Sequence, residues 1–254
     1  MKRAPWSAVG AATIAAGALV AGQALFATRR RDLPVIPGLD ASGVEGDPTL
    51  PAVRLGCAGD STLTGPGLDD PSDVWIRQAA RVVARDRHVV VRSWAAGGSL
   101  VRDVIETQLD PLLAYEPDVA VVAVGSNDAI HWTPLRDVEA SFRSLTRALT
   151  SAVPVAVIGG LGDLGAIARV PSPLSAVVTS RGRAVNRVIR EVVADFPTAV
   201  YVDVSTADGA FRAGGRSVFS ADLFHPNREG HAIWAMVAAP VLAHAVRQVP
   251  VSPR

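Results

Sequence analysis

The sequence predicts an α/β fold: one doubly wound, three-layer domain with a five-stranded parallel sheet, preceded by one hydrophobic N-terminal helix. Five short apolar runs rich in valine have the length and composition of buried parallel strands. Amphipathic stretches of helical length alternate with these runs, an order that builds a parallel sheet covered by helices. With 254 residues, the chain is long enough for one well-buried domain and an extension.

The first element, residues 1–31, is expected to be a membrane anchor. Ala4–Thr28 carries no ionisable side chain, and a helix needs about 20 apolar residues to span a bilayer. Lys2 and Arg3 precede this stretch and Arg29–Arg31 close it, so the basic flanks hardly decide its orientation. A cleaved signal peptide, which would leave a secreted protein, is the alternative.

Residues 32–51 contain four prolines and three glycines without periodicity, which predicts a linker. The domain then covers residues 52–254. Its strands are expected at 52–57, 88–94, 118–124, 153–158 and 199–204. Its helices are expected near 71–86, 100–115, 135–151, 174–195 and 229–247.

Composition excludes several classes of protein. A formal net charge of +1, with no basic or aromatic stripe, gives no reason to expect a nucleic-acid partner. Cys57 is the only cysteine, so the chain has no intrachain disulfide and no cysteine cluster for a metal. Lys2 is the only lysine, whereas a Walker-A site and a pyridoxal-phosphate Schiff base both need a lysine inside the fold. We expect a monomer without cofactor or metal.

A serine follows the first predicted strand of the domain. Leu55–Gly67 reads LGCAGDSTLTGPG, so Ser61 comes just past the carboxyl end of a buried strand. Ligands bind at that edge of open α/β sheets. A serine on a tight turn there can be a nucleophile if a base reaches it. Taken alone, the pattern favours an ordinary turn with a polar helix cap.

Two further strand ends carry polar or flexible residues. Asn127 follows the third strand, and its amide can stabilise an oxyanion, although a helix cap is the simpler interpretation. Gly97 and Gly98 follow the second strand, where glycine lets the backbone approach a ligand or pack tightly on a helix.

An aspartate and a histidine stand three residues apart near the C-terminus. Asp222 can orient the ring of His225, and Pro226 keeps His225 out of a helix. Of the other histidines, His131 and His231 flank this region as surface or supporting residues, and the remaining two fall in a strand and a helix. A metal site from Asp222, His225 and His231 is a weaker alternative.

Together, four segments resemble the SGNH/GDSL hydrolase superfamily, from about Arg54 to Val241. In order, the matching segments are Gly59-Asp60-Ser61, Gly98, Gly125-Ser126-Asn127-Asp128 and Asp222-Leu223-Phe224-His225-Pro226. The resemblance implies a flavodoxin-like α/β/α fold and hydrolysis of acyl esters through an acyl-serine. The family often has asparagine where this chain has Ser93, and threonine stands between Ser61 and the leucine of the nucleophile segment.

The resemblance also implies a role for each matching residue. Ser61 would be the nucleophile, His225 the general base and Asp222 its orienting partner. The oxyanion hole would consist of the backbone N–H groups of Ser61 and Gly98 and the side chain of Asn127. An O-acyltransferase or a deacetylase of envelope glycans would use the same residues. A flavodoxin-like ligand-binding module is the non-enzymatic alternative, because fold does not fix function.

The predicted substrate is a small-molecule or envelope-linked ester with a short acyl chain. Six phenylalanines and no long apolar insertion argue against a lid over a lipid tail. Trp94 and Trp132 are candidates for the acyl pocket, and Leu63–Asp73 and Leu161–Pro173 for its mouth. With the predicted anchor, the enzyme would be a single-pass protein of the plasma membrane with its catalytic domain on the extracytoplasmic side.

Overall fold

The computed structural model describes residues 6–29 and 33–250, with the backbone alone for residues 6–12. Within this part of the chain, a six-stranded sheet has the order β1-β3-β2-β4-β5-β6. Strands β2 to β6 are parallel, and β1 pairs with β3 in the antiparallel sense. The strands are β1 Gly43–Glu45, β2 Ala52–Gly59, β3 His88–Ser93, β4 Val119–Ala123, β5 Val155–Gly159 and β6 Ala199–Val202.

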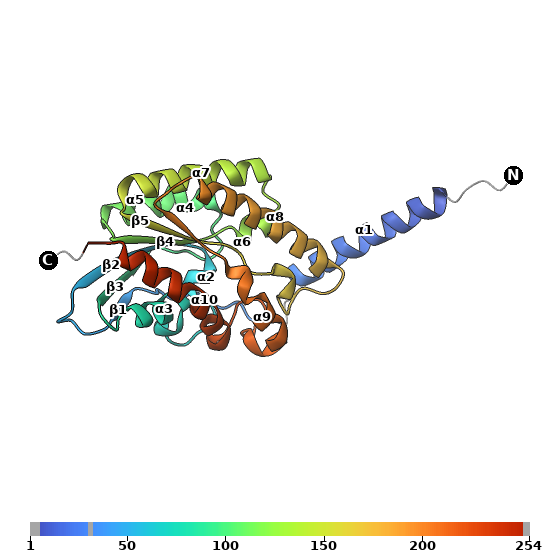
Figure 1. Ribbon diagram of the computed structural model, residues 1–254. Helices are drawn as coiled ribbons and strands as arrows, with labels where there is room; N and C mark the ends of the chain where they lie inside the picture. The colour runs from blue at the N-terminus through green and yellow to red at the C-terminus, as the bar shows by residue number, and fades with distance from the viewer. Residues whose placement is uncertain (1–5, 30–32, 251–254) are drawn as a thin grey trace.

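Helices cover both faces of the sheet (Figure 1). One face carries α3 and α10, and the other carries α4, α5, α7 and α8. The helices are α1 Trp6–Thr28, α2 Ser61–Thr64, α3 Trp75–Val83, α4 Val101–Thr107, α5 Leu109–Ala114, α6 Ser126–Ile130, α7 Leu135–Ala152, α8 Leu174–Ala194, α9 Asp208–Gly214 and α10 Arg228–Arg247. Single 3₁₀ turns are η1 Pro71–Asp73, η2 Leu164–Ala166, η3 Val204–Ala207 and η4 Gly215–Val218.

The central strands β2, β4 and β5 are buried on both faces, which is why they read as continuous apolar runs. In β4, Val119 and Val121 pack in the core under α3 and α10, whereas Ala120 and Val122 pack in the core under α7 and α8. The predicted three-layer α/β architecture is therefore confirmed. A strand overlaps each of the five predicted ranges, although β2 and β5 extend past the predicted ends.

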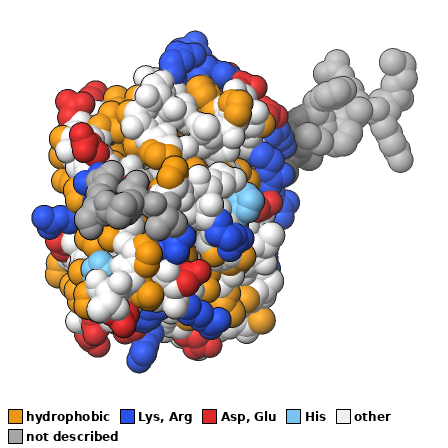
Figure 2. Space-filling model, turned by 60° about the vertical axis from the view of Figure 1, so that its left-hand side comes forward, with side chains coloured by type: hydrophobic (Ala, Val, Ile, Leu, Met, Phe, Trp, Pro, Cys, Tyr) orange, Lys and Arg blue, Asp and Glu red, His pale blue; other side chains and the backbone are white. Residues whose placement is uncertain are grey.

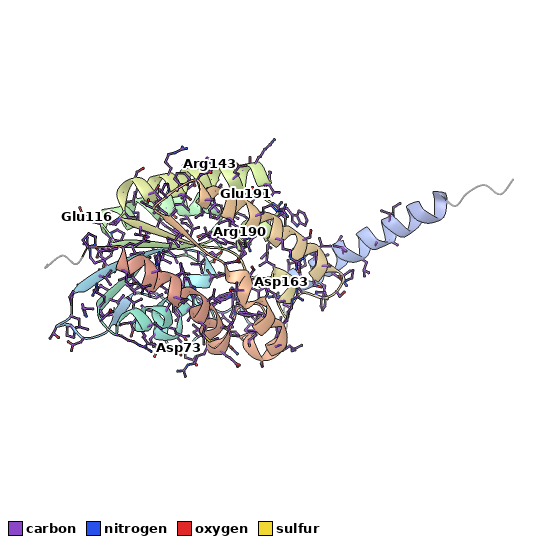
Figure 3. All side chains as sticks on the ribbon, viewed as in Figure 1. Asp73, Glu116, Arg143, Asp163, Arg190 and Glu191 are labelled. Carbon is purple, nitrogen blue, oxygen red and sulfur yellow. The ribbon has the colours of Figure 1, made fainter. Side chains whose placement is uncertain are left out.

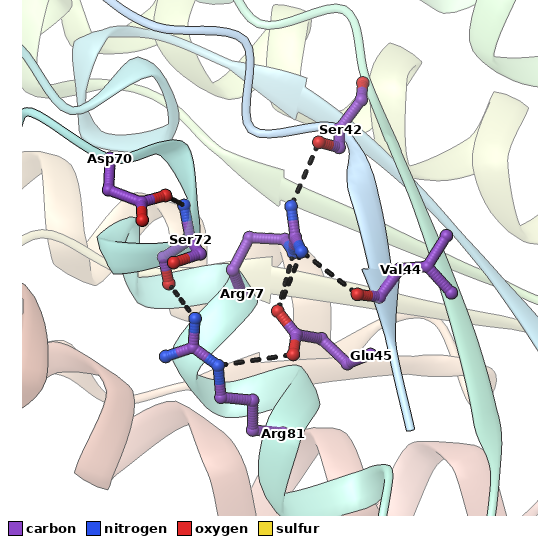
Figure 4. Close-up of polar contacts among 7 residues, drawn as sticks. All are labelled: Ser42, Val44, Glu45, Asp70, Ser72, Arg77 and Arg81. Atoms are coloured by element: carbon purple, nitrogen blue, oxygen red, sulfur yellow. Dashed lines mark hydrogen bonds and ion pairs between the residues drawn. The ribbon is translucent and has the colours of Figure 1, made fainter. Parts of the chain in front are cut away.

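The predicted number of strands is wrong, because β1 is a sixth strand inside the range expected to be a linker. Buried Arg77 of α3 holds β1 in place (Figure 4). Its guanidinium donates to the carbonyl oxygens of Ser42 and Val44 and forms an ion pair with Glu45 at 2.8 Å. Three residues are too few to show the alternating pattern of a strand. The formation of β1 therefore depends on this tertiary contact and not on its local sequence.

The N-terminal segment forms α1, and its last turns pack on the domain. The Gln23 amide donates to the carbonyl oxygen of Ser172 at 2.7 Å and accepts from the N–H of Leu174 at 3.0 Å. Arg169 donates to the carbonyl oxygen of Ala27 at 2.6 Å. Among the described residues, no helix has the length and apolar character that crossing a membrane requires. The predicted membrane-spanning helix thus has no support here, and part of that prediction lies outside the described residues.

Candidate active site

The end of β2 places Ser61 on a tight turn. Ser61 is the first residue of α2, and Asp60 is the N-cap, with its carboxylate accepting the N–H of Thr62 at 2.9 Å. A side chain at Gly59 would overlap the carbonyl oxygen of Ala123 in the neighbouring strand, so the strand can end this closely only with glycine. Burial raises the pKa of Asp60 to about 6.

The glycine loop after β3 lies beside Ser61. A Cβ atom on Gly97 would stand 4.0 Å from the Cβ of Ser61. Gly98 has a φ of +83° and open space where a side chain would point. The position therefore favours glycine for its backbone conformation and leaves room for a ligand above the loop.

Asn127 lies at the same edge of the sheet, in the first turn of α6. Its Nδ2 donates to the carbonyl oxygen of Ser99 at 3.1 Å, which ties it to the glycine loop. A side-chain amide has two N–H groups, so the second remains available for a ligand. The neighbouring carboxylate of Asp128 accepts the N–H of Val101 at 3.0 Å and fixes the start of α4.

Gln108 is a buried residue that the sequence reasoning missed. Its Oε1 accepts the N–H of Gly59 at 2.8 Å, and its Nε2 donates to the carbonyl oxygen of Gly59 at 3.1 Å and to Ser99 Oγ at 3.0 Å. One side chain thus joins the turn before Ser61 to the loop after Gly98. The sequence signal that could have identified it is a glutamine on the core side of the predicted helix 100–115. The structure splits that helix at Gln108 into α4 and α5.

Asp222 and His225 form a close pair before α10. The Nδ1 atom of His225 lies 2.6 Å from Oδ2 of Asp222. The other oxygen, Oδ1, accepts the backbone N–H groups of Phe224 and His225, each at 3.0 Å. Burial works to raise the pKa of Asp222, but the hydrogen bond from His225 and the two backbone hydrogen bonds outweigh it and hold the pKa below its usual value. The carboxylate is therefore ionised and can orient the ring.

The other candidate histidines lie elsewhere. His131 is exposed. His231 is fully buried, and its Nδ1 accepts the N–H of Trp75 at 3.2 Å. Burial lowers the pKa of His231 to about 3, so this ring stays neutral. Within the described residues, no group of three or more His, Cys, Asp or Glu side chains could hold a metal ion, so the metal alternative fails.

A largely apolar cavity of about 110 Å³ extends from Ser61 and His225 between the sheet and α10. Val121 and Val157 of the sheet and Trp234 of α10 line it. The predicted loop Leu161–Pro173 contributes to its wall, but Leu63–Asp73 does not. Trp94 packs on Tyr115 with ring centroids 5.6 Å apart, and Trp132 is 57% exposed, so neither predicted tryptophan lines this cavity.

Ser61 and His225, which is paired with Asp222, line one cavity at the carboxyl edge of the sheet, an arrangement typical of serine hydrolases. Residues 57–233 match the model of the GDSL-like Lipase/Acylhydrolase family, so the chain belongs to that family.

The chain is also similar to characterised proteins. It is 32% identical over 193 residues to a GDSL-like esterase of Mycobacterium tuberculosis, Rv1075c, across 72% of this chain and 59% of that protein. The chain therefore spans well under two thirds of that relative.

Solved structures share the fold at lower identity. LAE5, an α/β hydrolase from the metagenome of Lake Arreo, has a TM-score of 0.60 at 17% identity, covering 76% of this chain and 95% of that one. A lipase/acylhydrolase from Enterococcus faecalis has a TM-score of 0.60 at 17% identity, covering 80% and 100%. Axe2, an acetylxylan esterase from Geobacillus stearothermophilus, has a TM-score of 0.54 at 19% identity, covering 81% and 99%.

Proposed function

We propose that this chain hydrolyses esters of short acyl chains through an acyl-serine intermediate formed on Ser61. The observation that carries the proposal is the apolar cavity lined by both Ser61 and His225. A nucleophile and a base that line one cavity can act on a single ester carbonyl inside it.

In the proposed reaction, His225 takes the proton of the Ser61 hydroxyl as its oxygen attacks the ester carbonyl. Asp222 keeps the proton of the ring on Nδ1, so that Nε2 is the atom that acts as base. The backbone N–H groups of Ser61 and Gly98 and the amide of Asn127 donate to the oxyanion. Losing one such donor typically costs about 3 kcal/mol of transition-state stabilisation. His225 then returns the proton to the leaving alcohol, and water releases the acyl group by the same route.

The volume of the cavity supports the proposal that the substrate carries a short acyl chain. An engineered apolar cavity of about 150 Å³ accepts benzene, with six carbons. Scaled to about 110 Å³, the same density gives room for roughly four carbons. This volume favours an acyl chain of about four carbons over a long one.

The test is the hydrolysis of p-nitrophenyl esters from acetate to palmitate, each below its micelle concentration. We expect kcat/KM to be largest at two to six carbons and Ser61→Ala to remove the activity while the protein stays folded. A maximum at twelve carbons or more would contradict the chain length, and a Ser61→Ala variant that keeps more than a few per cent of the rate would contradict the nucleophile. Thr206→Ala, an exposed position outside the cavity, serves as the control.

The cellular location is proposed from the sequence alone. The stretch Ala4–Thr28 without ionisable side chains, followed by the segment rich in proline and glycine, favours an anchored enzyme with residues 52–254 outside the plasma membrane. A C-terminal alkaline phosphatase fusion should then be active and the matching green fluorescent fusion dark. The reverse pattern would place the domain in the cytoplasm.

A further inference from the structure

A partly buried carboxylate lines the wall of the apolar cavity. Asp208, the first residue of α9, faces both this cavity and the neighbouring surface groove along α8. Its Oδ1 accepts the backbone N–H of Asp163 at 2.8 Å, and among the described residues it forms no ion pair. Burial raises the pKa of Asp208 to about 6. A partly buried carboxylate with one hydrogen bond has acceptor capacity left for a ligand.

Asp163, whose backbone N–H binds Asp208, is itself held in place by hydrogen bonds and an ion pair of its side chain. Asp163, labelled in Figure 3, accepts the N–H of Gly165 at 2.9 Å and the hydroxyl of Thr179 at 2.5 Å, and it forms an ion pair with Arg212. These interactions fix the position of Asp163, and therefore of the backbone N–H that Oδ1 of Asp208 accepts. The carboxylate is therefore positioned by the fold before any substrate binds.

The indole nitrogen of Trp234 lies in the same part of the cavity. A Cβ atom built on Gly162 would stand 3.7 Å from Oδ1 of Asp208 and 3.9 Å from Nε1 of Trp234. The indole ring is fixed by Phe211, with ring centroids 5.5 Å apart, and by His231, at 5.4 Å. All of Asp208, Gly162 and Trp234 line the cavity. An acceptor and a donor thus flank the small space beside Gly162.

We propose that Asp208 and Trp234 form a polar subsite that binds a hydroxyl group carried on the acyl chain of the substrate. The inference rests on the proposed function, because it places the acyl chain in the cavity beside Ser61. A hydroxyl group matches the pair: its O–H donates to the Asp208 carboxylate, and its oxygen accepts the indole N–H of Trp234. Gly162 keeps the space between the two groups open.

Whether the enzyme prefers the hydroxylated or the unsubstituted acyl chain distinguishes this subsite from a purely apolar pocket. Moving a hydroxyl group from water into a cavity without partners is unfavourable, so an apolar acyl pocket prefers the unsubstituted chain. A pocket with a matching donor and acceptor reverses that order, and a hydrogen bond to a charged group is worth about tenfold or more in binding.

The experiment compares ethyl butanoate with ethyl 3-hydroxybutanoate and ethyl 4-hydroxybutanoate in a pH-stat at pH 8. We expect at least one hydroxy ester to exceed ethyl butanoate about tenfold in kcat/KM. Trp234→Phe, which keeps an aromatic ring but removes the N–H, and Asp208→Asn should each bring this ratio near or below one. Gly162→Ala, whose methyl group meets only ordinary contacts, should lower the ratio by filling the space. Trp132→Phe, at an exposed tryptophan outside the cavity, is the matched control and should keep the wild-type ratio.

Hydrolysis of all three esters with ethyl butanoate the best substrate would overturn the polar subsite and leave the esterase proposal standing. The subsite is equally overturned by a hydroxy-ester preference that Trp234→Phe and Asp208→Asn leave intact. No hydrolysis of any of the three esters by the folded protein would instead refute short-chain ester hydrolysis, and the subsite with it.

Discussion

Replacing Gln108 by leucine should weaken both the fold and the reaction. The change keeps the approximate volume but removes three buried hydrogen bonds, two to the backbone of Gly59 and one to Ser99 Oγ. The carbonyl oxygen of Gly59 keeps a second donor, the N–H of Ala96 at 3.1 Å, whereas the N–H of Gly59 loses the partner that the structure gives it. An unpaired buried N–H costs about 1–3 kcal/mol and each lost bond about 1 kcal/mol, so we expect the free energy of unfolding to fall by about 3 kcal/mol.

Catalysis should suffer separately from stability. Gly59 precedes the turn of Ser61, and Ser99 follows Gly98, so Gln108 fixes the distance between two of the proposed oxyanion donors. We expect kcat to fall at least tenfold, toward the loss that follows removal of one donor, with KM nearly unchanged. The kcat and KM values are measured with p-nitrophenyl acetate as substrate, at a temperature where the variant is fully folded.

Gln78→Leu is the matched control. The side chain of Gln78 donates to the carbonyl oxygen of Asp73 at 2.6 Å and lies outside the cavity. It should lose about 1 kcal/mol in a urea titration and keep its kcat. If Gln108→Leu matches this control in urea midpoint and in kcat, Gln108 is not a positioning residue.

Three further predictions concern the site. Asp60 has its pKa raised from 3.8 to about 6 by burial, so the folded state binds its proton more tightly than the unfolded state. As pH falls from 7.5 to 4, wild type should gain about 2 kcal/mol of stability relative to Asp60→Asn, and urea midpoints that shift in parallel for both would contradict this. Asp222→Asn should retain more kcat than His225→Ala, because orienting the base is a smaller task than accepting the proton; equal residual rates would count against that division of roles. EDTA should leave hydrolysis unchanged, and a loss that added zinc restores would revive a metal mechanism.

The strands and the site pair could be predicted because their signals are local. Each central strand is buried on both faces, so its valines appear as one apolar run in the sequence. Asp222 and His225 are three residues apart, and the turn between them brings their side chains to 2.6 Å. Figure 2 illustrates the opposite case: on the face it shows, hydrophobic, acidic and basic side chains are interspersed, and they carry little information about the fold.

The features that the sequence did not reveal depend on contacts between distant segments. β1 is held by Arg77, 32 residues away from Glu45, which binds that carboxylate and the carbonyl oxygens of Ser42 and Val44, and a three-residue strand has no pattern of its own. Gln108 bonds to Gly59 across 49 residues, and its place on the core side of a predicted helix does not reveal which distant partner its side chain binds.

The acyl cavity combines both kinds of information. Its position follows from the sheet, since the carboxyl ends of parallel strands bring Ser61 and the loop after β5 to one edge. Its walls do not follow, because Trp234 and Phe211 come from α10 and α9 and meet only after those helices pack with ring centroids 5.5 Å apart. Sequence motifs therefore point to the chemistry that we propose, whereas the proposed acyl preference depends on Asp208, Gly162 and Trp234, three residues outside every motif.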